Sequence, residues 1–531
     1  MRVGAALILC LAAALSRAEK VILIPLDSRP AVGQFAQLIA RMASIQVIIP
    51  PSEMLGKFTV PGKPDQILNW LEQQPLSDVS AVIVSTDMVG YGGLIASRVS
   101  DTPAQLALER LNRLASFKRR HPNIRIYGMS AIMRLFPTST KASASWRVPL
   151  GRYAEMKDRY RRTKEASYLD RIIALQTKIP PLELQRYEGA RSRNFGIQQN
   201  LIRKTAEGIF DYLILGQDDA QPFGPHIPET QKLKTLTDQL QIGGKVYFCE
   251  GVDQLSNILV SRATLKSSGW TPRVRIVYSD DAGKRKIANY ESKNVETSVR
   301  DQIVASGARP WVSGDYDYTL WLNTPDPSSA TFGRFLDTLV DEVDQGFPAG
   351  VADINLGKTG TGDSRLFDQL WNKDRMIRLL AYAGWNTAGN TMGTSIPAAN
   401  VYLLARRNGV FPLKRELAQR EFVLHRFVND YAYHKYVRPA AYKLIDSLPT
   451  GSREETYGED FEYVNHFVQK DMAEYFEKYF REQFYQKRFF AGSVQYQIVG
   501  SEGLRVALPW PRAYEVRLDF RLIAQPVSSS P

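Results

Sequence analysis

Two adjacent aspartates are the clearest candidates for chemistry in this sequence. Asp218 and Asp219 follow the apolar run "YLILG" and Gln217, so they stand directly after a predicted buried strand. Two carboxyl groups held close together bind protons unequally, which lets one donate a proton while the other stays ionised. The pair therefore predicts general acid–base catalysis by Asp218 and Asp219. Hydrolysis of a glycosidic bond is the preferred interpretation.

Polar side chains also follow several other predicted strands. Loops after parallel strands gather at one edge of an α/β fold, so we expect these side chains to line one concavity. Arg29 and Arg98 should offset the repulsion between the carboxylates. The predicted substrate-binding residues are Asp27, Arg29, Asp87, Tyr91, Arg98, Gln217, His226, Trp385, Asn386 and Asn390.

The substrate class follows from the acidic pair and its neighbours. An adjacent pair of carboxylates after a strand is similar to the arrangement in substrate-assisted hexosaminidases, where one carboxylate orients the acetamido group and the other protonates the leaving oxygen. Side chains such as Trp385, Asn386 and Tyr91 supply the aromatic faces and amides that a sugar requires. An N-acetylated amino sugar is the predicted substrate, with no cofactor and no metal ion.

The sequence is also compatible with two other functions. A metal-dependent hydrolase of phosphate or amide bonds would use Asp27, Asp87, Asp218, Asp219, His226 and Asp281 as ligands. The chain has only five histidines, and none stands in an H-x-H or H-E-x-x-H spacing, which disfavours this alternative. The third possibility is a protein that binds sugar without cleaving it.

The elements that must position these residues alternate between strand and helix. Short β-branched runs such as "KVILIPL" and "SAVIVST" are separated by amphipathic segments such as "TPAQLALERLNRLASFKRR". This alternation predicts an α/β fold with parallel strands over residues 19–405. We expect a (β/α)8 barrel-like domain, with an open doubly wound parallel sheet as the alternative. Residues 406–531 are predicted to form a C-terminal helical region with terminal β-strands.

The N-terminus and the charge indicate where the protein works. Residues 1–18 have the positive start, apolar core and small-residue end of a secretory signal peptide, so the protein is predicted to be exported after cleavage near Ala18. No later stretch is long and apolar enough to predict an integral membrane segment. The formal charge is +13, but the basic residues are scattered and lack an aromatic stacking platform. Nucleic acid is therefore not an expected partner, whereas a carbohydrate or another small molecule is.

Several motifs resemble one known family. The motifs "PLDSRP", "DMVGYGGLIASR", "LGQDDA", "AGWNTAGNTMGT" and "LPWPRAYEV" are similar to those of the bacterial family called domain of unknown function 4127. The resemblance extends over nearly the whole chain after residue 18. It implies bacterial origin and a single shared architecture, and it supplies no established activity.

Overall fold

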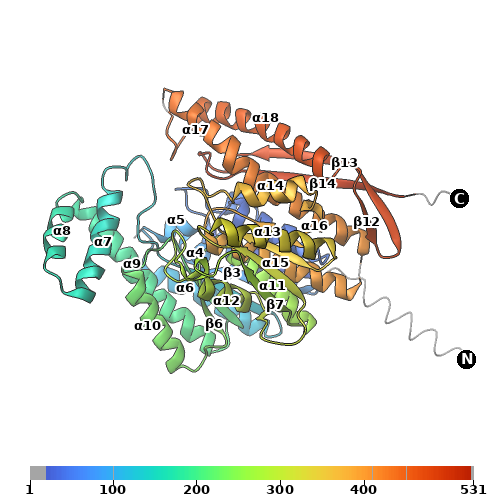
Figure 1. Ribbon diagram of the computed structural model, residues 1–531. Helices are drawn as coiled ribbons and strands as arrows, with labels where there is room; N and C mark the ends of the chain where they lie inside the picture. Colours follow the sequence, from blue (N-terminus) through green and yellow to red (C-terminus); the bar gives the residue numbers. More distant parts are fainter. Residues whose placement is uncertain (1–18, 100, 410, 450, 528–531) are drawn as a thin grey trace, which may run out of the picture.

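The structure is a computed structural model that describes residues 19–99, 101–409, 411–449 and 451–527 (Figure 1). The predicted signal peptide, residues 1–18, lies outside the described residues. Within the part of the chain that is described, no helix has both the length and the apolar character needed to cross a membrane.

The first half of the chain builds a parallel sheet of six strands. In space their order is β2-β1-β3-β4-β5-β6. All six residues of β5 are buried, as expected for a parallel strand with both faces covered. The strands are β1 (Lys20–Ile24), β2 (Gln46–Ile48), β3 (Val79–Ser85), β4 (Arg125–Ile132), β5 (Tyr212–Gln217) and β6 (Val246–Glu250).

A second parallel sheet follows, with the strand order β11-β10-β9-β7-β8. Its central strands β9 and β10 are buried along their whole length. The strands are β7 (Arg273–Tyr278), β8 (Arg309–Pro310), β9 (Tyr318–Asn323), β10 (Ala349–Asp353) and β11 (Ala381–Ala383).

Three helices form a layer between the two sheets: α2 (Gln34–Arg41), α11 (Leu255–Ser268) and α15 (Ala388–Asn408). Helix α11 contacts β3 and β4 of the first sheet, whereas α15 contacts β10 and β11 of the second, and the two helices pack on each other. A Cβ atom at Gly389 would lie 2.5 Å from the carbonyl oxygen of Glu250, so only glycine lets α15 approach the end of β6. This close approach brings the two sheets together at the ends of their strands.

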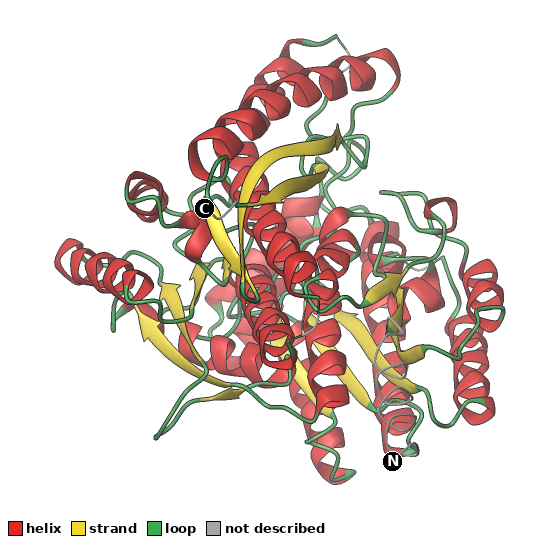
Figure 2. Cartoon of the chain, turned by 90° about the vertical axis from the view of Figure 1, so that its right-hand side faces the viewer, coloured by secondary structure: helices red, strands yellow, loops and turns green. Residues whose placement is uncertain are grey.

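Other helices cover the outer faces of the sheets, with the parallel strands (yellow) between them in Figure 2. One hydrophobic cluster joins the first sheet to α3, α4, α6, α9 and α10. On the second sheet, Trp321 of β9 contacts Phe335 of α13. These helices are α3 (Pro64–Glu72), α4 (Thr86–Tyr91), α5 (Leu94–Ser97), α6 (Ala104–Arg120), α9 (Pro181–Ala206), α10 (His226–Gln239), α12 (Val295–Ala305), α13 (Ser329–Asp344) and α14 (Ser364–Asn372). Helices α7 (Arg147–Thr163) and α8 (Ser167–Gln176) instead pack on each other and extend away from the sheets, at the left of Figure 1.

The C-terminal region is helical with terminal strands. Apolar residues recur every three or four positions along α18 and are buried, among them Val464, Val468, Met472 and Phe476. Strands β12, β13 and β14 form an antiparallel sheet beside α18, at the top of Figure 1. The elements are α16 (Pro412–Arg426), the π-helical η5 (Phe427–Val437), α17 (Arg438–Ser447), α18 (Gly458–Gln483), β12 (Arg488–Ala491), β13 (Val494–Ala507) and β14 (Arg517–Pro526).

The predicted α/β fold is confirmed, but the strands do not pair as a barrel requires. Among the described strands, pairing joins β1–β6 into one sheet and β7–β11 into another, and no recorded pair closes either sheet into a ring. The pairing resembles the alternative prediction, an open doubly wound parallel sheet, except that the strands divide into two sheets where one was predicted. The physical reason is the helix layer, because α2, α11 and α15 fill the space between the sheets. One continuous hydrophobic core includes residues of both parallel sheets and of the C-terminal region.

Candidate functional site

A cavity of about 450 Å³, which we call the carboxyl-edge pocket, lies beyond the carboxyl ends of β5 and β6. The segments after β1, β3, β4, β7, β10 and β11 and the C-terminal region complete it. The charged side chains that line it are Arg29, Arg98, Arg134, Arg147, Lys358, Arg438, Arg453, Arg512, Asp218, Asp219, Asp253 and Glu454. The polar and aromatic side chains include Gln217, Tyr290, Asn386, Asn390, Trp510 and Tyr514.

Asp27, Arg29 and Asp253 form a buried cluster at this pocket. The Arg29 guanidinium donates hydrogen bonds to Asp27 Oδ2 at 2.7 Å and to Asp253 Oδ1 at 2.7 Å, and it also lies 5.2 Å from the ring centre of Trp510. The single positive charge of Arg29 is thus shared by the carboxylates of Asp27 and Asp253. Burial and the nearby negative charges of Asp27 and Asp218 raise the pKa of Asp253, although Arg29 opposes the shift.

Asp218 and Asp219 both reach the pocket, and each has its own arginine. Asp218 Oδ2 accepts hydrogen bonds from Arg98 Nε at 3.0 Å and from Arg98 Nη2 at 2.6 Å. Asp219 Oδ2 pairs with Arg134. The Asp218 side chain is 4% exposed, whereas that of Asp219 is 31% exposed. Asp219 is therefore the member of the pair more open to a ligand.

Asp87 and Tyr91 lie on α4, outside the pocket lining. Burial raises the pKa of Asp87 to about 7, and the charge of Asp218 adds to this effect. The N–H of Ala131 donates to Asp87 Oδ2 at 2.9 Å and opposes the shift. Tyr91 is buried beneath Arg193, whose guanidinium lies 4.1 Å from the ring centre. Asp87 therefore does not line the pocket, but it lies close enough to Asp218 for the charge of Asp218 to raise its pKa.

Three predicted amide side chains do line the pocket: Gln217, Asn386 and Asn390. Gln217 is the last residue of β5, and its Nε2 donates to the Asp218 carbonyl oxygen at 2.7 Å. Asn386 Oδ1 accepts a hydrogen bond from the Tyr514 hydroxyl at 2.7 Å. Asn390, in the first turn of α15, is 3% exposed and its Oδ1 has no hydrogen-bond partner.

His226 and Trp385 were predicted to bind substrate, but neither lines this pocket. His226 is 1% exposed, and its Nε2 contacts the Gln221 carbonyl oxygen at 2.9 Å. Burial and the charge of Arg191 lower the pKa of His226 to about 4. Trp385 packs edge-on against Phe35 within the core. Both side chains are therefore packed inside the protein: His226 at the start of α10, and Trp385 against α2.

Several lining residues were missed by the sequence analysis. Asp253 follows β6, the strand that "KVYFCEG" only suggested, so the strand-end pattern could have identified it. Trp510 and Tyr514 belong to "LPWPRAYEV", a motif that indicated the family resemblance but no role for either residue. Arg134 follows β4, so the same pattern could have identified it as well. Arg438 carried no local signal, because its place at the pocket depends on how distant segments pack.

The metal ligands predicted as an alternative do not form one cluster, because Asp218 and Asp219 line the carboxyl-edge pocket while Asp281 and His226 lie elsewhere. Asp281 is exposed and pairs with Lys284, and His226 is enclosed in its own loop. In residues 19–99, 101–409, 411–449 and 451–527, no group of three or more His, Cys, Asp or Glu side chains is arranged to hold a metal ion.

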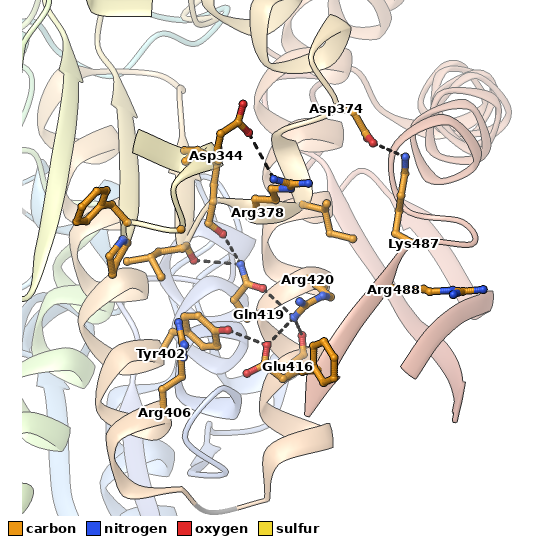
Figure 3. A pocket seen from close by; sticks show the side chains of 18 residues that line it. Asp344, Asp374, Arg378, Tyr402, Arg406, Glu416, Gln419, Arg420, Lys487 and Arg488 are labelled. Carbon is orange, nitrogen blue, oxygen red and sulfur yellow. Dashed lines mark hydrogen bonds and ion pairs between the residues drawn. The ribbon is translucent and has the colours of Figure 1, made fainter. Parts of the chain in front are cut away.

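A second cavity, of about 520 Å³, lies at the opposite ends of the second-sheet strands, beside the residues that precede β10 and β11. We call it the amino-edge pocket (Figure 3). Its acidic side chains are each paired with a cation: Asp344 with Arg378, Asp374 with Lys487 and Glu416 with Arg420. None of the predicted site residues lines it.

Comparison with known proteins gave one match. A family model described as "Protein of unknown function (DUF4127)" matches residues 21–519. No curated protein and no solved structure matches the chain. The family match covers both parallel sheets and nearly all of the C-terminal region that completes the carboxyl-edge pocket. The chain therefore belongs to the DUF4127 family.

Proposed function

We propose that this protein is a hydrolase that cleaves a glycosidic bond in the carboxyl-edge pocket. The observation that carries the proposal is the convergence of three carboxyl groups, Asp218, Asp219 and Asp253, on one cavity of about 450 Å³. A cavity of this size accommodates a sugar and part of its neighbour. Export, as the N-terminal segment predicts, is part of the same proposal.

Asp253 is the proposed general acid. An acid catalyst must hold a proton at working pH, and the raised pKa of Asp253 favours the protonated form. It would give that proton to the leaving oxygen as the glycosidic C–O bond breaks. This role differs from the sequence-based assignment of proton donation to the Asp218–Asp219 pair. All three carboxyl groups accept hydrogen bonds from arginine, but Asp253 shares its arginine, Arg29, with Asp27, whereas Arg98 pairs with Asp218 alone and Arg134 with Asp219 alone.

Asp218 and Asp219 are the proposed ionised partners. Their negative charges would stabilise the positive charge that develops on the sugar ring in the transition state. Asp219, the more exposed of the two, would take the proton from the water molecule that adds to the anomeric carbon. On an N-acetylated amino sugar, the same carboxylate would instead orient the acetamido N–H.

Aromatic and amide groups in the pocket suit a sugar substrate. Tyr514, which is exposed, offers a ring, and Asn386 and Asn390 offer amide groups for hydroxyls. Trp510 lines the pocket with little of its own surface exposed and packs beneath Arg29 and Arg512. The Oδ1 atom of Asn390 is a buried acceptor without a donor, so a ligand hydroxyl would satisfy it.

The test is hydrolysis of a panel of aryl glycosides and bacterial wall saccharides by the purified protein. Asp253→Asn should lower kcat by about 10²–10⁴-fold, the usual contribution of a general acid. Asp219→Asn should also lower kcat. The matched control is Asp374→Asn in the amino-edge pocket, which should leave kcat unchanged. Full activity in both Asp253→Asn and Asp219→Asn would contradict the proposal.

A protein that binds a sugar without cleaving it is the second candidate. The ion pairs of Asp218 with Arg98 and of Asp219 with Arg134 favour it, because paired carboxylates can serve recognition alone. Stoichiometric binding of an intact saccharide, with no product after prolonged incubation, would select this function. Loss of activity with EDTA, and recovery with Mn²⁺ or Zn²⁺, would instead select the metal-dependent hydrolase.

A further inference from the structure

The carboxyl-edge pocket contains more positive charge than its carboxylates neutralise. Eight of its lining residues are arginine or lysine, whereas four are aspartate or glutamate. Five of the eight have an acidic partner within ion-pair distance. In the described part of the chain, no carboxylate lies within that distance of Arg147, Lys358 or Arg438.

Of these three cations, Arg438, the first residue of α17, gives the clearest indication of what the pocket binds. It is 5% exposed, and its guanidinium donates to two backbone carbonyl oxygens, those of Tyr514 and Thr359. Its Nε has no acceptor. A buried cation that only neutral groups surround is unfavourable, and it becomes favourable when an anion approaches. The burial of Arg438 therefore points to a negatively charged ligand.

Arg147 extends the same positive region. It lies in the first turn of α7, and its Nε donates to the Pro137 carbonyl oxygen at 2.6 Å. Burial lowers the pKa of Arg147, and the positive charge of Arg134 lowers it further. The charges of Asp219 and Glu454 oppose this shift, but the ion pair of Asp219 is with Arg134, and the burial of Arg147 outweighs them.

Tyr514 connects these cations to the proposed catalytic carboxylates. Its ring centre lies 5.2 Å from the guanidinium of Arg438, and its hydroxyl donates to Asn386. The charge of Asp219 also acts on the Tyr514 hydroxyl. A sugar that contacts Tyr514 can therefore reach Asp219 on one side and Arg438 on the other.

We propose that Arg147, Lys358 and Arg438 form a subsite for an anionic group, so that the substrate is an acidic saccharide with a carboxylate or phosphate substituent. This inference rests on the proposed function and names its substrate class. Guanidinium groups suit both anions because their paired N–H groups match two oxygen atoms. Lys358, which is exposed, would add charge at the pocket entrance.

Calorimetric titration of the full protein tests the subsite without requiring turnover. The probes are D-glucuronate, D-glucose 6-phosphate and neutral D-glucose, at one ionic strength set with NaCl. We expect at least one anionic sugar to bind about tenfold or more tightly than glucose, since a hydrogen bond to a charged group contributes that much. Comparison of the two anionic probes decides between carboxylate and phosphate.

Single substitutions show which cations produce the preference for an anionic sugar. Arg147→Met should reduce the preference for the anionic sugar to a few-fold or less. Arg438→Lys keeps the buried charge but loses the planar fork, so it should fold and bind the anion more weakly than the unchanged protein. Arg378→Met, in the amino-edge pocket, is the matched control and should bind like the unchanged protein.

The outcomes separate the subsite from the proposed reaction. Equal binding of neutral and anionic sugars, or an unchanged preference in both Arg147→Met and Arg438→Lys, would overturn the subsite. Cleavage of neutral glycosides without any anion preference would overturn the subsite and support the reaction. Anion binding that depends on Arg147 and Arg438, without cleavage of any saccharide, would support the subsite and overturn the reaction.

Discussion

The carboxyl-edge pocket and the amino-edge pocket differ in how their charged side chains are paired. In the amino-edge pocket, the three acidic side chains each have a cation, and the two cations without an acidic partner, Arg406 and Arg488, are exposed to water. Figure 3 shows the pairs Asp344–Arg378 and Asp374–Lys487 at the rim of this cavity. In the carboxyl-edge pocket, the buried Arg29 pairs with two carboxylates, whereas the buried Arg438 has no acidic partner among the described residues.

The difference shows which of two cavities of similar size is adapted to bind a ligand. Water stabilises the exposed cations of the amino-edge pocket. Two buried atoms there, Asp374 Oδ1 and Arg420 Nε, also have no hydrogen-bond partner among the described residues, but both side chains belong to ion pairs. Buried charges without partners cost free energy, and a protein retains them where a ligand or a reaction uses them. Cavity size alone would not separate the two, since their volumes are about 520 and 450 Å³.

The largest expected effect comes from removing Arg29. The change Arg29→Met leaves Asp27 and Asp253 buried without their shared cation. Loss of one partner from a buried ion pair costs about 3–5 kcal/mol. We expect the free energy of unfolding to fall by roughly that amount, measured by urea denaturation at pH 7.

The matched control is Arg378→Met in the amino-edge pocket. The Arg378 side chain is 53% exposed, so water replaces its ion pair with Asp344. We expect no measurable change in the urea midpoint. Equal losses in Arg29→Met and Arg378→Met would remove the proposed distinction between the two pockets.

A smaller, pH-dependent effect is expected from Asp87. An unfolded aspartate titrates near pH 4, whereas the folded pKa of Asp87 is raised to about 7. The folded protein therefore keeps a proton that the unfolded chain has lost, and this stabilisation is complete below about pH 4 and is lost as the pH rises through about 7. Asp87→Asn cannot ionise, yet it retains an acceptor for the Ala131 N–H.

Thermal or urea unfolding between pH 4 and pH 8 measures this effect. The two proteins should differ least near pH 4, where both side chains are neutral. The variant should gain stability relative to the unchanged protein as the pH rises, by up to a few kcal/mol at about 1.4 kcal/mol per pKa unit. Parallel stability curves would show that Asp87 ionises normally in the folded protein.

The smallest effects are expected from substituting two tryptophans, one of which should change substrate binding and the other stability. Trp510 lines the carboxyl-edge pocket and lies beside Arg29, whereas Trp385 packs in the core. Trp510→Phe should raise the KM of the substrate, or weaken its binding, by a few-fold, because the smaller ring offers less surface. Trp385→Phe should leave KM unchanged and lower the free energy of unfolding by about 1–2 kcal/mol. A KM effect of Trp385→Phe alone would restore the sequence-based assignment.

Part of the site could be predicted because strand ends are visible in a sequence. Asp27, Asp218 and Asn386 each follow a short apolar run, and loops after parallel strands meet at one edge. The inward direction of Trp385 and His226 could not be predicted in this way. A side chain that follows a strand can face a ligand or the protein core. Which of the two it faces depends on how the surrounding helices pack.

The sequence by itself determined the α/β class, because the alternation of β-branched runs with amphipathic segments is a local property. It also determined that Asp218 and Asp219 would follow a buried strand. Only the tertiary structure decided that the strands form two sheets, since both a barrel and open sheets satisfy the same local pattern. Tertiary structure also decided which arginine meets which carboxylate: Arg98 lies 120 residues from Asp218, and Arg29 lies 224 residues from Asp253. Contacts over such distances depend on the packing of whole sheets and helices, which no short stretch of sequence encodes.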